Sequence, residues 1–91
     1  MKNNLDDEKL KKLAYVSVST YRVKAMKSLK DAEVKIPTDI AKDAGIRTNH
    51  ISKVLTELKD IGLAECINEE AHKGRLYRLT DEGREISKNL E

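Results

Sequence analysis

Polar side chains that can form hydrogen bonds dominate the stretch from residue 47 to residue 56. Amide, hydroxyl, imidazole and cationic groups are the types that can read base edges in the major groove of duplex DNA. The acids Glu57 and Asp60 follow only after this stretch, where a helix inserted by its N-terminal end would be leaving the groove. The candidate major-groove contacts are Arg47, Thr48, Asn49, His50, Ser52, Lys53 and Thr56.

A second group of cations lies in and just after the polar segment 68–74. A basic loop beside a DNA-reading helix can contact the phosphate backbone or a minor groove. Glu69 and Glu70 lie in the same segment and would face the same phosphates, which weakens this interpretation. The candidate backbone contacts are His72, Lys73, Arg75 and Arg78.

The sequence offers little material for other chemistry. It has no Cys/His or Ser/His/Asp arrangement at motif spacing and no phosphate-binding glycine loop, so we expect no enzyme activity, no cofactor and no metal site. Cys66 is most simply a small apolar residue of a strand, with a redox or metal-binding role as the alternative. His50 could also sense pH, because imidazole titrates near neutrality.

Length and composition set the scale of the molecule. A chain of 91 residues fits one domain, and its single cysteine suits a reducing compartment. The longest apolar run, residues 13–16, is too short for a membrane span or a signal peptide, so we expect a cytoplasmic protein without a membrane partner. The net charge of +2 is too small to identify a nucleic-acid partner by itself.

Two short helices joined by a tight turn would position the candidate major-groove residues. The pattern predicts a helix over residues 39–44 capped by Thr38, a left-handed turn at Gly45, and a helix from Thr48, as its cap, to about Asp60. Residues of both helices would pack as a helix-turn-helix. The core of this motif is predicted to be Ile40, Ala41, Gly45, Ile46, Ile51, Val54, Leu55, Leu58 and Leu63.

Further elements are predicted on both sides of this motif. Before it, Ser19 or Thr20 caps a helix over residues 21–30, in which Arg22 shares one face with Ala25, Met26 and Leu29, and an extended stretch covers residues 33–36. After it, strands over 63–67 and 75–79 form a hairpin, and Thr80 caps a last helix. The first dozen residues, capped by Asn3 or Asn4, form a frayed or partner-dependent helix.

The run I-A-x-x-A-G-I-x-x-x-x-I-S-x-x-L-x-x-L-x-x-x-G-L from residue 40 to residue 63 resembles a winged helix-turn-helix. The continuation K-G-R-L-Y-R-L-T-D-E-G-R-E, residues 73–85, is similar to the second wing strand and following helix of MarR- and ArsR-like regulators. The start of the hairpin, G-L-x-E-C-x-N at residues 62–68, resembles small stand-alone winged-helix proteins of archaea.

The resemblance implies a mostly helical α+β fold with a three-helix core, a two-stranded wing and a C-terminal helix. Residues 15–87 would form this domain, preceded by a polar segment or short helix over 1–14 and followed by a tail over 88–91, whose last two residues could derive from an expression vector. The long flanking helices of MarR proteins and the metal-binding residues of ArsR proteins are missing.

The function implied by the resemblance is sequence-specific binding of double-stranded DNA by a dimeric transcription regulator. The helix over 48–60 would enter the major groove, and the wing over 68–75 would contact the backbone or the minor groove. A protein- or RNA-docking module on the same scaffold is the alternative, and the sequence identifies no effector. Apolar residues at the two chain ends are expected to be buried against a second copy: Leu5, Leu10, Leu13, Val16, Ile86 and Leu90.

Overall fold

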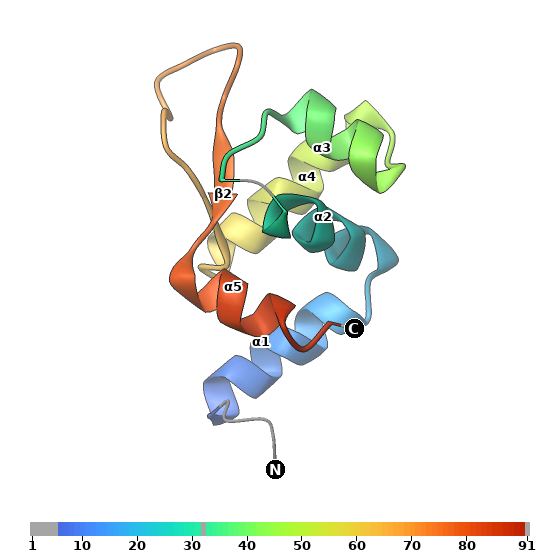
Figure 1. Cartoon of the computed structure of the whole chain (residues 1–91), viewed down its shortest axis with the longest axis vertical. Helices are drawn as coiled ribbons and strands as arrows, with labels where there is room; N and C mark the ends of the chain where they lie inside the picture. Colours follow the sequence, from blue (N-terminus) through green and yellow to red (C-terminus); the bar gives the residue numbers. More distant parts are fainter. Residues whose placement is uncertain (1–5, 32, 91) are drawn as a thin grey trace.

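The computed structural model describes residues 6–31 and 33–90 and places them in one elongated body of 42 × 24 × 20 Å. The mostly helical fold with a hairpin and a C-terminal helix is confirmed (Figure 1). The loop between the two strands projects at the end of the molecule opposite α1. The elements are α1 (Asp7–Ser17), α2 (Thr20–Lys30), α3 (Pro37–Ala44), α4 (Thr48–Asp60), β1 (Ala64–Cys66), β2 (Tyr77–Leu79) and α5 (Asp81–Ser87).

Helices α2, α3 and α4 pack against one another around one core. Gly45 ends α3 in the left-handed conformation, with φ of 70°, as predicted, and lies at the surface. Because the turn is tight, the amide of Ile46 donates to the carbonyl of Ala41 at 2.9 Å, and both side chains are buried. The other predicted core residues of the motif are also buried, namely Ile40, Ile51, Val54, Leu55, Leu58 and Leu63.

The predicted capping residues of α3 and α4 are wrong. Helix α3 begins at Pro37, with Ile36 as its N-cap, so Thr38 already lies inside the helix. Proline is favoured at the first helical position, because its fixed φ suits the helix and its missing N–H would be unpaired there anyway. Helix α4 begins at Thr48 itself, after Arg47, and neither helix start has a side-chain cap.

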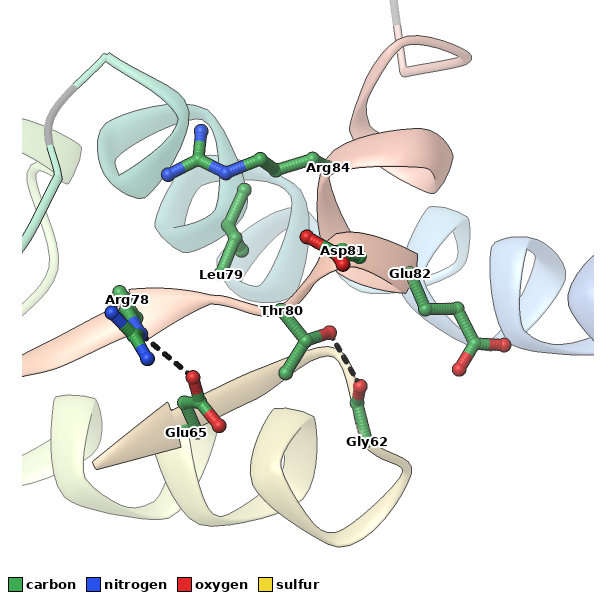
Figure 2. A pocket seen from close by; sticks show the side chains of 8 residues that line it. All are labelled: Gly62, Glu65, Arg78, Leu79, Thr80, Asp81, Glu82 and Arg84. Atoms are coloured by element: carbon green, nitrogen blue, oxygen red, sulfur yellow. Dashed lines mark hydrogen bonds and ion pairs between the residues drawn. The ribbon is translucent and has the colours of Figure 1, made fainter. Parts of the chain in front are cut away.

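The other two predicted caps are confirmed, Ser19 for α2 and Thr80 for α5. The Ser19 hydroxyl accepts from the amide of Arg22 at 3.2 Å. The Thr80 hydroxyl accepts from the amide of Gly83 at 3.0 Å and donates to the carbonyl of Gly62 at 2.7 Å (Figure 2). The hydroxyl therefore ties the start of α5 to the end of α4.

The hairpin is antiparallel, as predicted, but its strands are shorter than the predicted ranges 63–67 and 75–79. Ala64 pairs with Leu79, and Cys66 pairs with Tyr77. A third extended segment joins them, because Lys35 and Tyr77 exchange both backbone hydrogen bonds at 2.9 Å. The extended stretch predicted before Pro37 therefore holds β2 from its other side.

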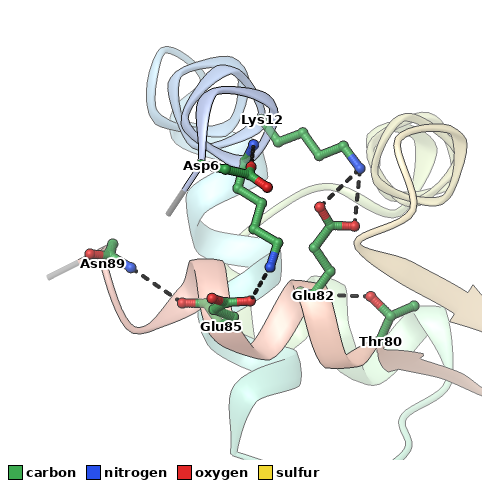
Figure 3. A network of polar contacts seen from close by, with 8 residues as sticks. Asp6, Lys12, Thr80, Glu82, Glu85 and Asn89 are labelled. Atoms are coloured by element: carbon green, nitrogen blue, oxygen red, sulfur yellow. Dashed lines mark hydrogen bonds and ion pairs between the residues drawn. The ribbon is translucent and has the colours of Figure 1, made fainter. Parts of the chain in front are cut away.

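Helix α1 packs on α2 and α5 of the same chain, so the predicted frayed or partner-dependent helix is wrong. Asp6 caps it by accepting from the amide of Lys9 at 2.9 Å, whereas the predicted caps at residues 3 and 4 lie outside the described residues. Lys9 binds Glu85 at 2.8 Å, and Lys12 binds Glu82 at 3.0 Å (Figure 3). The helix also crosses the predicted boundary between residues 14 and 15.

The apolar residues at the two chain ends are mostly covered within one chain. Val16 and Ile86 are fully buried, Leu90 is 7% exposed, and Leu13 packs against the core. The expectation that these side chains need a second copy to cover them is therefore wrong, because α1, α2 and α5 already enclose them. Leu10 is 40% exposed, and residue 5 lies outside the described residues. No helix within the described ranges is long and apolar enough to cross a membrane.

Candidate nucleic-acid interface

The outward face of α4 consists of polar side chains held on a rigid apolar base. Ile51 and Val54 point into the core together with Leu55 and Leu58, and this stripe fixes which side of the helix faces solvent. All seven predicted major-groove residues are exposed, and they follow one another from the residue before α4 to the middle of the helix: Arg47, Thr48, Asn49, His50, Ser52, Lys53 and Thr56.

A three-part contact that the sequence analysis missed fixes α4 against α1 and α2. The Arg22 guanidinium donates to the Glu57 carboxylate of α4 at 3.1 Å and to the backbone carbonyl of Tyr15 at 2.8 Å. It also stacks over the Tyr15 ring, 3.7 Å from the ring centre. The signal was present, because Arg22 is a charged residue on an otherwise apolar helix face and needs a buried partner.

A second contact between α2 and α4 lies closer to the start of α4. The Tyr21 and His50 rings approach with their centres 5.6 Å apart and their planes tilted by 41°. Tyr21 is 40% exposed, so the ring contacts His50 of α4 and is still partly open to solvent.

The four predicted cations of the hairpin are divided between two roles. His72 and Lys73 are exposed at the loop, and within the described part of the chain neither forms an ion pair. Arg75 instead closes the loop, donating to the carbonyls of Ala71 at 2.8 Å and Glu69 at 3.0 Å. Among these four, His72 and Lys73 are therefore the side chains best placed for a ligand.

The fourth cation, Arg78, lies on β2 and pairs with Glu65 of β1 at 2.6 Å (Figure 2). These two side chains flank a surface hollow of about 580 Å³ between the hairpin and the start of α5. The remaining charges around the hollow are mixed, with Asp81 and Glu82 opposite Arg84. We assign it no anion because the acids would repel one.

The Asn68 side chain organises the start of the loop. Its amide oxygen accepts from the amide of Leu76 at 2.7 Å, and its amide nitrogen donates to the carbonyl of Gly74 at 3.2 Å. Cys66 is 9% exposed and its thiol lies 3.5 Å from the same oxygen, which fits the expected small core residue.

One of the two acids that weakened the wing interpretation is neutralised by α4. Glu69 binds Lys59 at 2.9 Å. The Lys59 ammonium lowers the pKa of Glu69, chiefly through this hydrogen bond, and the Glu69 carboxylate raises the pKa of Lys59 in the same way. Glu70 remains exposed in the same segment.

Comparison with known proteins supports the fold. No protein-family model and no curated protein matches the chain. A solved structure, described as a MarR family transcriptional regulator from Silicibacter pomeroyi DSS-3, aligns with 92% of this chain at 17% identity and a TM-score of 0.71. A second, NadR in complex with 4-hydroxyphenylacetate, aligns with 90% of this chain at 17% identity and a TM-score of 0.67.

The chain spans 62% of the length of each of these two structures. At 17% identity the likeness establishes the winged-helix fold and leaves function to be argued from the site. The resemblance to ArsR-like and archaeal proteins stays a prediction from the sequence.

Proposed function

We propose that this chain is a transcription regulator that binds double-stranded DNA in a sequence-specific way. Helix α4 enters the major groove, and the loop between β1 and β2 contacts the backbone or the minor groove. The observation that carries the proposal is the face of α4. Its exposed half holds amide, hydroxyl, imidazole and ammonium groups, while its first acid, Glu57, is bound to Arg22.

The fold supports the same proposal, because a MarR family transcriptional regulator shares it. Sequence-specific reading then falls to the polar residues of α4, and affinity comes largely from lysine and arginine contacts to phosphate. The chain works as a homodimer in the cytoplasm, with its two α4 helices about 34 Å apart on successive major grooves of one DNA face.

A docking module on the same scaffold is the second candidate, and the surface of α4 argues against it. Such a module would tend to show apolar residues on this face, because exposed apolar patches mark docking sites. The large hydrophobic residues that are exposed within the described chain are Leu10, Val18, Tyr21 and Ile67, and none lies on α4.

The deciding experiment is selection from a pool of randomised duplexes at two salt concentrations, followed by sequencing of the retained DNA. An enriched motif with twofold symmetry is the expected result. Retention that is salt-sensitive but without enrichment would assign a nonspecific architectural role, and no retention at low salt would favour protein docking.

A further inference from the structure

A small groove lies between the start of α2 and the flank of α4, with a volume of about 250 Å³. Ser19, Tyr21 and Arg22 line it from α2 and its cap. His50, Lys53, Val54 and Glu57 line it from α4. It therefore opens along the side of the helix that the proposed function places in the major groove.

Helical geometry divides the exposed face of α4 into two sides. At about 100° per residue, His50 lies about 100° from the inward-pointing Ile51 on the side that meets α2, whereas Lys53 lies about 160° from Ile51 and points nearly straight outward. Asn49, Ser52 and Thr56 fall on the opposite side. Lys53 lies only about 40° from Asn49, so it stands at the edge between the groove, which it lines, and the outward face of α4.

The charges in the groove favour an anion. Glu57 is the groove's acid, and its carboxylate is occupied by Arg22, whose side chain is only 16% exposed. Lys53 is exposed and forms no ion pair with the described residues, so its ammonium is available at the groove's mouth. The Tyr21 hydroxyl likewise has no hydrogen-bond partner among residues 6–31 and 33–90.

A DNA strand borders the major groove on each side of an inserted helix, so a phosphate lies beside the helix flank. We propose that the groove holds one phosphodiester of the bound DNA, with the Lys53 ammonium and the Tyr21 hydroxyl as donors. His50 is a positioning residue, because its ring packs against Tyr21 and limits where that hydroxyl points. This inference rests on the proposed function, and it moves His50 and Lys53 from reading bases to holding the backbone.

The first test is the salt dependence of binding by Lys53→Gln on a duplex of fixed sequence. In the proposed dimer the substitution removes one phosphate contact from each half-site, and each lost contact reduces the steepness of log affinity against log salt by about 0.9, which is about eightfold in affinity at 0.1 M salt relative to 1 M. The motif selected from random DNA should be unchanged. Lys11→Gln is the matched control, because this exposed lysine lies on α1, at the end opposite the loop, and its slope should equal that of the wild type.

The second test is Tyr21→Phe, which keeps the ring against His50 and removes only the hydroxyl. We expect binding to every duplex to weaken about ten- to a hundredfold, the range for one hydrogen bond to a charged group. Tyr15→Phe, which removes a hydroxyl outside the groove, should bind like the wild type. A neutral methylphosphonate moved along the selected motif should weaken wild-type binding at each phosphate that the protein contacts, and in Lys53→Gln the effect should disappear at one of these positions in each half-site while the others keep theirs.

The outcomes separate this inference from the proposed function. If the wild type binds no duplex, the proposed function fails. If it binds but Lys53→Gln keeps the salt slope and changes the base selected at one position, Lys53 reads a base and the inference is overturned. It is also overturned if neither Lys53→Gln nor Tyr21→Phe changes the affinity for DNA. A third contrary result would be that inorganic phosphate alone shifts the His50 ring signals in NMR to saturation, while no methylphosphonate substitution changes the affinity for DNA.

Discussion

At the scale of single residues, Gly83 shows how an absent side chain determines packing. A Cβ atom at this position would overlap the carbonyl oxygen of Leu63 and lie 3.0 Å from its carbonyl carbon. Both atoms belong to the backbone, so they cannot rotate away. The first turn of α5 can therefore lie directly on the chain that links α4 to β1.

Gly83→Ala should lower the free energy of unfolding by about 1–3 kcal/mol, the usual cost of overpacking. The loss arises because α5 must move away from Leu63, even though alanine is the better helix former. Urea unfolding followed by circular dichroism measures it. Arg84→Ala, at the next and exposed position of the same helix, is the control and should stay within about 0.5 kcal/mol of the wild type.

Asn49 is the residue on which the proposed base reading depends most directly, because its amide can both donate to and accept from one base. Asn49→Ala should cost about 1–3 kcal/mol on the selected motif and very little on random duplexes. Lys73→Ala, in the exposed loop, should weaken both kinds of DNA equally. Equal losses for the two variants on both kinds of DNA would exclude base reading by Asn49.

At the scale of elements, a small polar network at the surface joins α2 and α3. Lys35 binds the Asp43 carboxylate and donates to both the hydroxyl and the carbonyl of Ser28, at 3.0 and 2.9 Å. The Lys35 ammonium, chiefly through its hydrogen bond, lowers the pKa of Asp43 below its ordinary value. The carboxylate is thus favoured in the folded state over the unfolded chain.

This network predicts a pH dependence with a definite sign. Because the folded pKa of Asp43 is the lower one, its stabilising contribution is present above about pH 4 and is lost as the pH falls through the folded pKa. The difference in unfolding free energy between the wild type and Asp43→Asn should therefore shrink in acid. In a protein that already carries Lys35→Met, Asp43→Asn should change the unfolding free energy by an amount that is largely independent of pH. If the effect of Asp43→Asn still varied with pH in that protein, Lys35 would not be the cause of the lowered pKa.

The sequence was sufficient for elements whose signals are local. Gly45, Ser19 and Thr80 act within one turn of themselves, and the apolar stripe of α4 repeats at the helical period, so each was predicted correctly. The start of α3 was wrong because threonine's preference for capping competed with Pro37, and the chain used the proline. Helix α4 begins one residue earlier than predicted, at Thr48 itself, with no side-chain cap. The Arg22–Glu57 pair joins residues far apart in sequence, which local patterns do not connect.

At the scale of the whole molecule, the burial of Val16, Ile86 and Leu90 within one chain changes where a second copy could bind. Sequence alone could not show this, because an apolar residue at a terminus fits equally well against its own chain or a partner. With Val16 and Ile86 enclosed, Leu10 is, among the predicted dimer residues that the structure describes, the one that it leaves substantially exposed. It lies on α1, away from the loop between the strands.

Leu10→Glu should therefore weaken self-association while leaving the fold intact, because the substitution is at an exposed site. Sedimentation velocity at micromolar concentration should show a dimer for the wild type and a monomer for the variant. DNA selection with the variant should recover one half of the twofold motif. Val18→Glu, at an exposed site in the turn after α1, is the control and should sediment like the wild type. A wild type that sediments as a monomer would exclude the dimer.

The backbone bridge between Lys35 and Tyr77 has a consequence for the thermodynamics of the DNA binding that we propose. With β1 on one side and residue 35 on the other, β2 is fixed to the same body that carries α4. The base of the wing is therefore already ordered in the free protein, so binding a duplex would cost little conformational entropy there. The contacts that the wing makes with DNA would then contribute to affinity with little entropic loss. Folding alone would set the angle between the wing and α4.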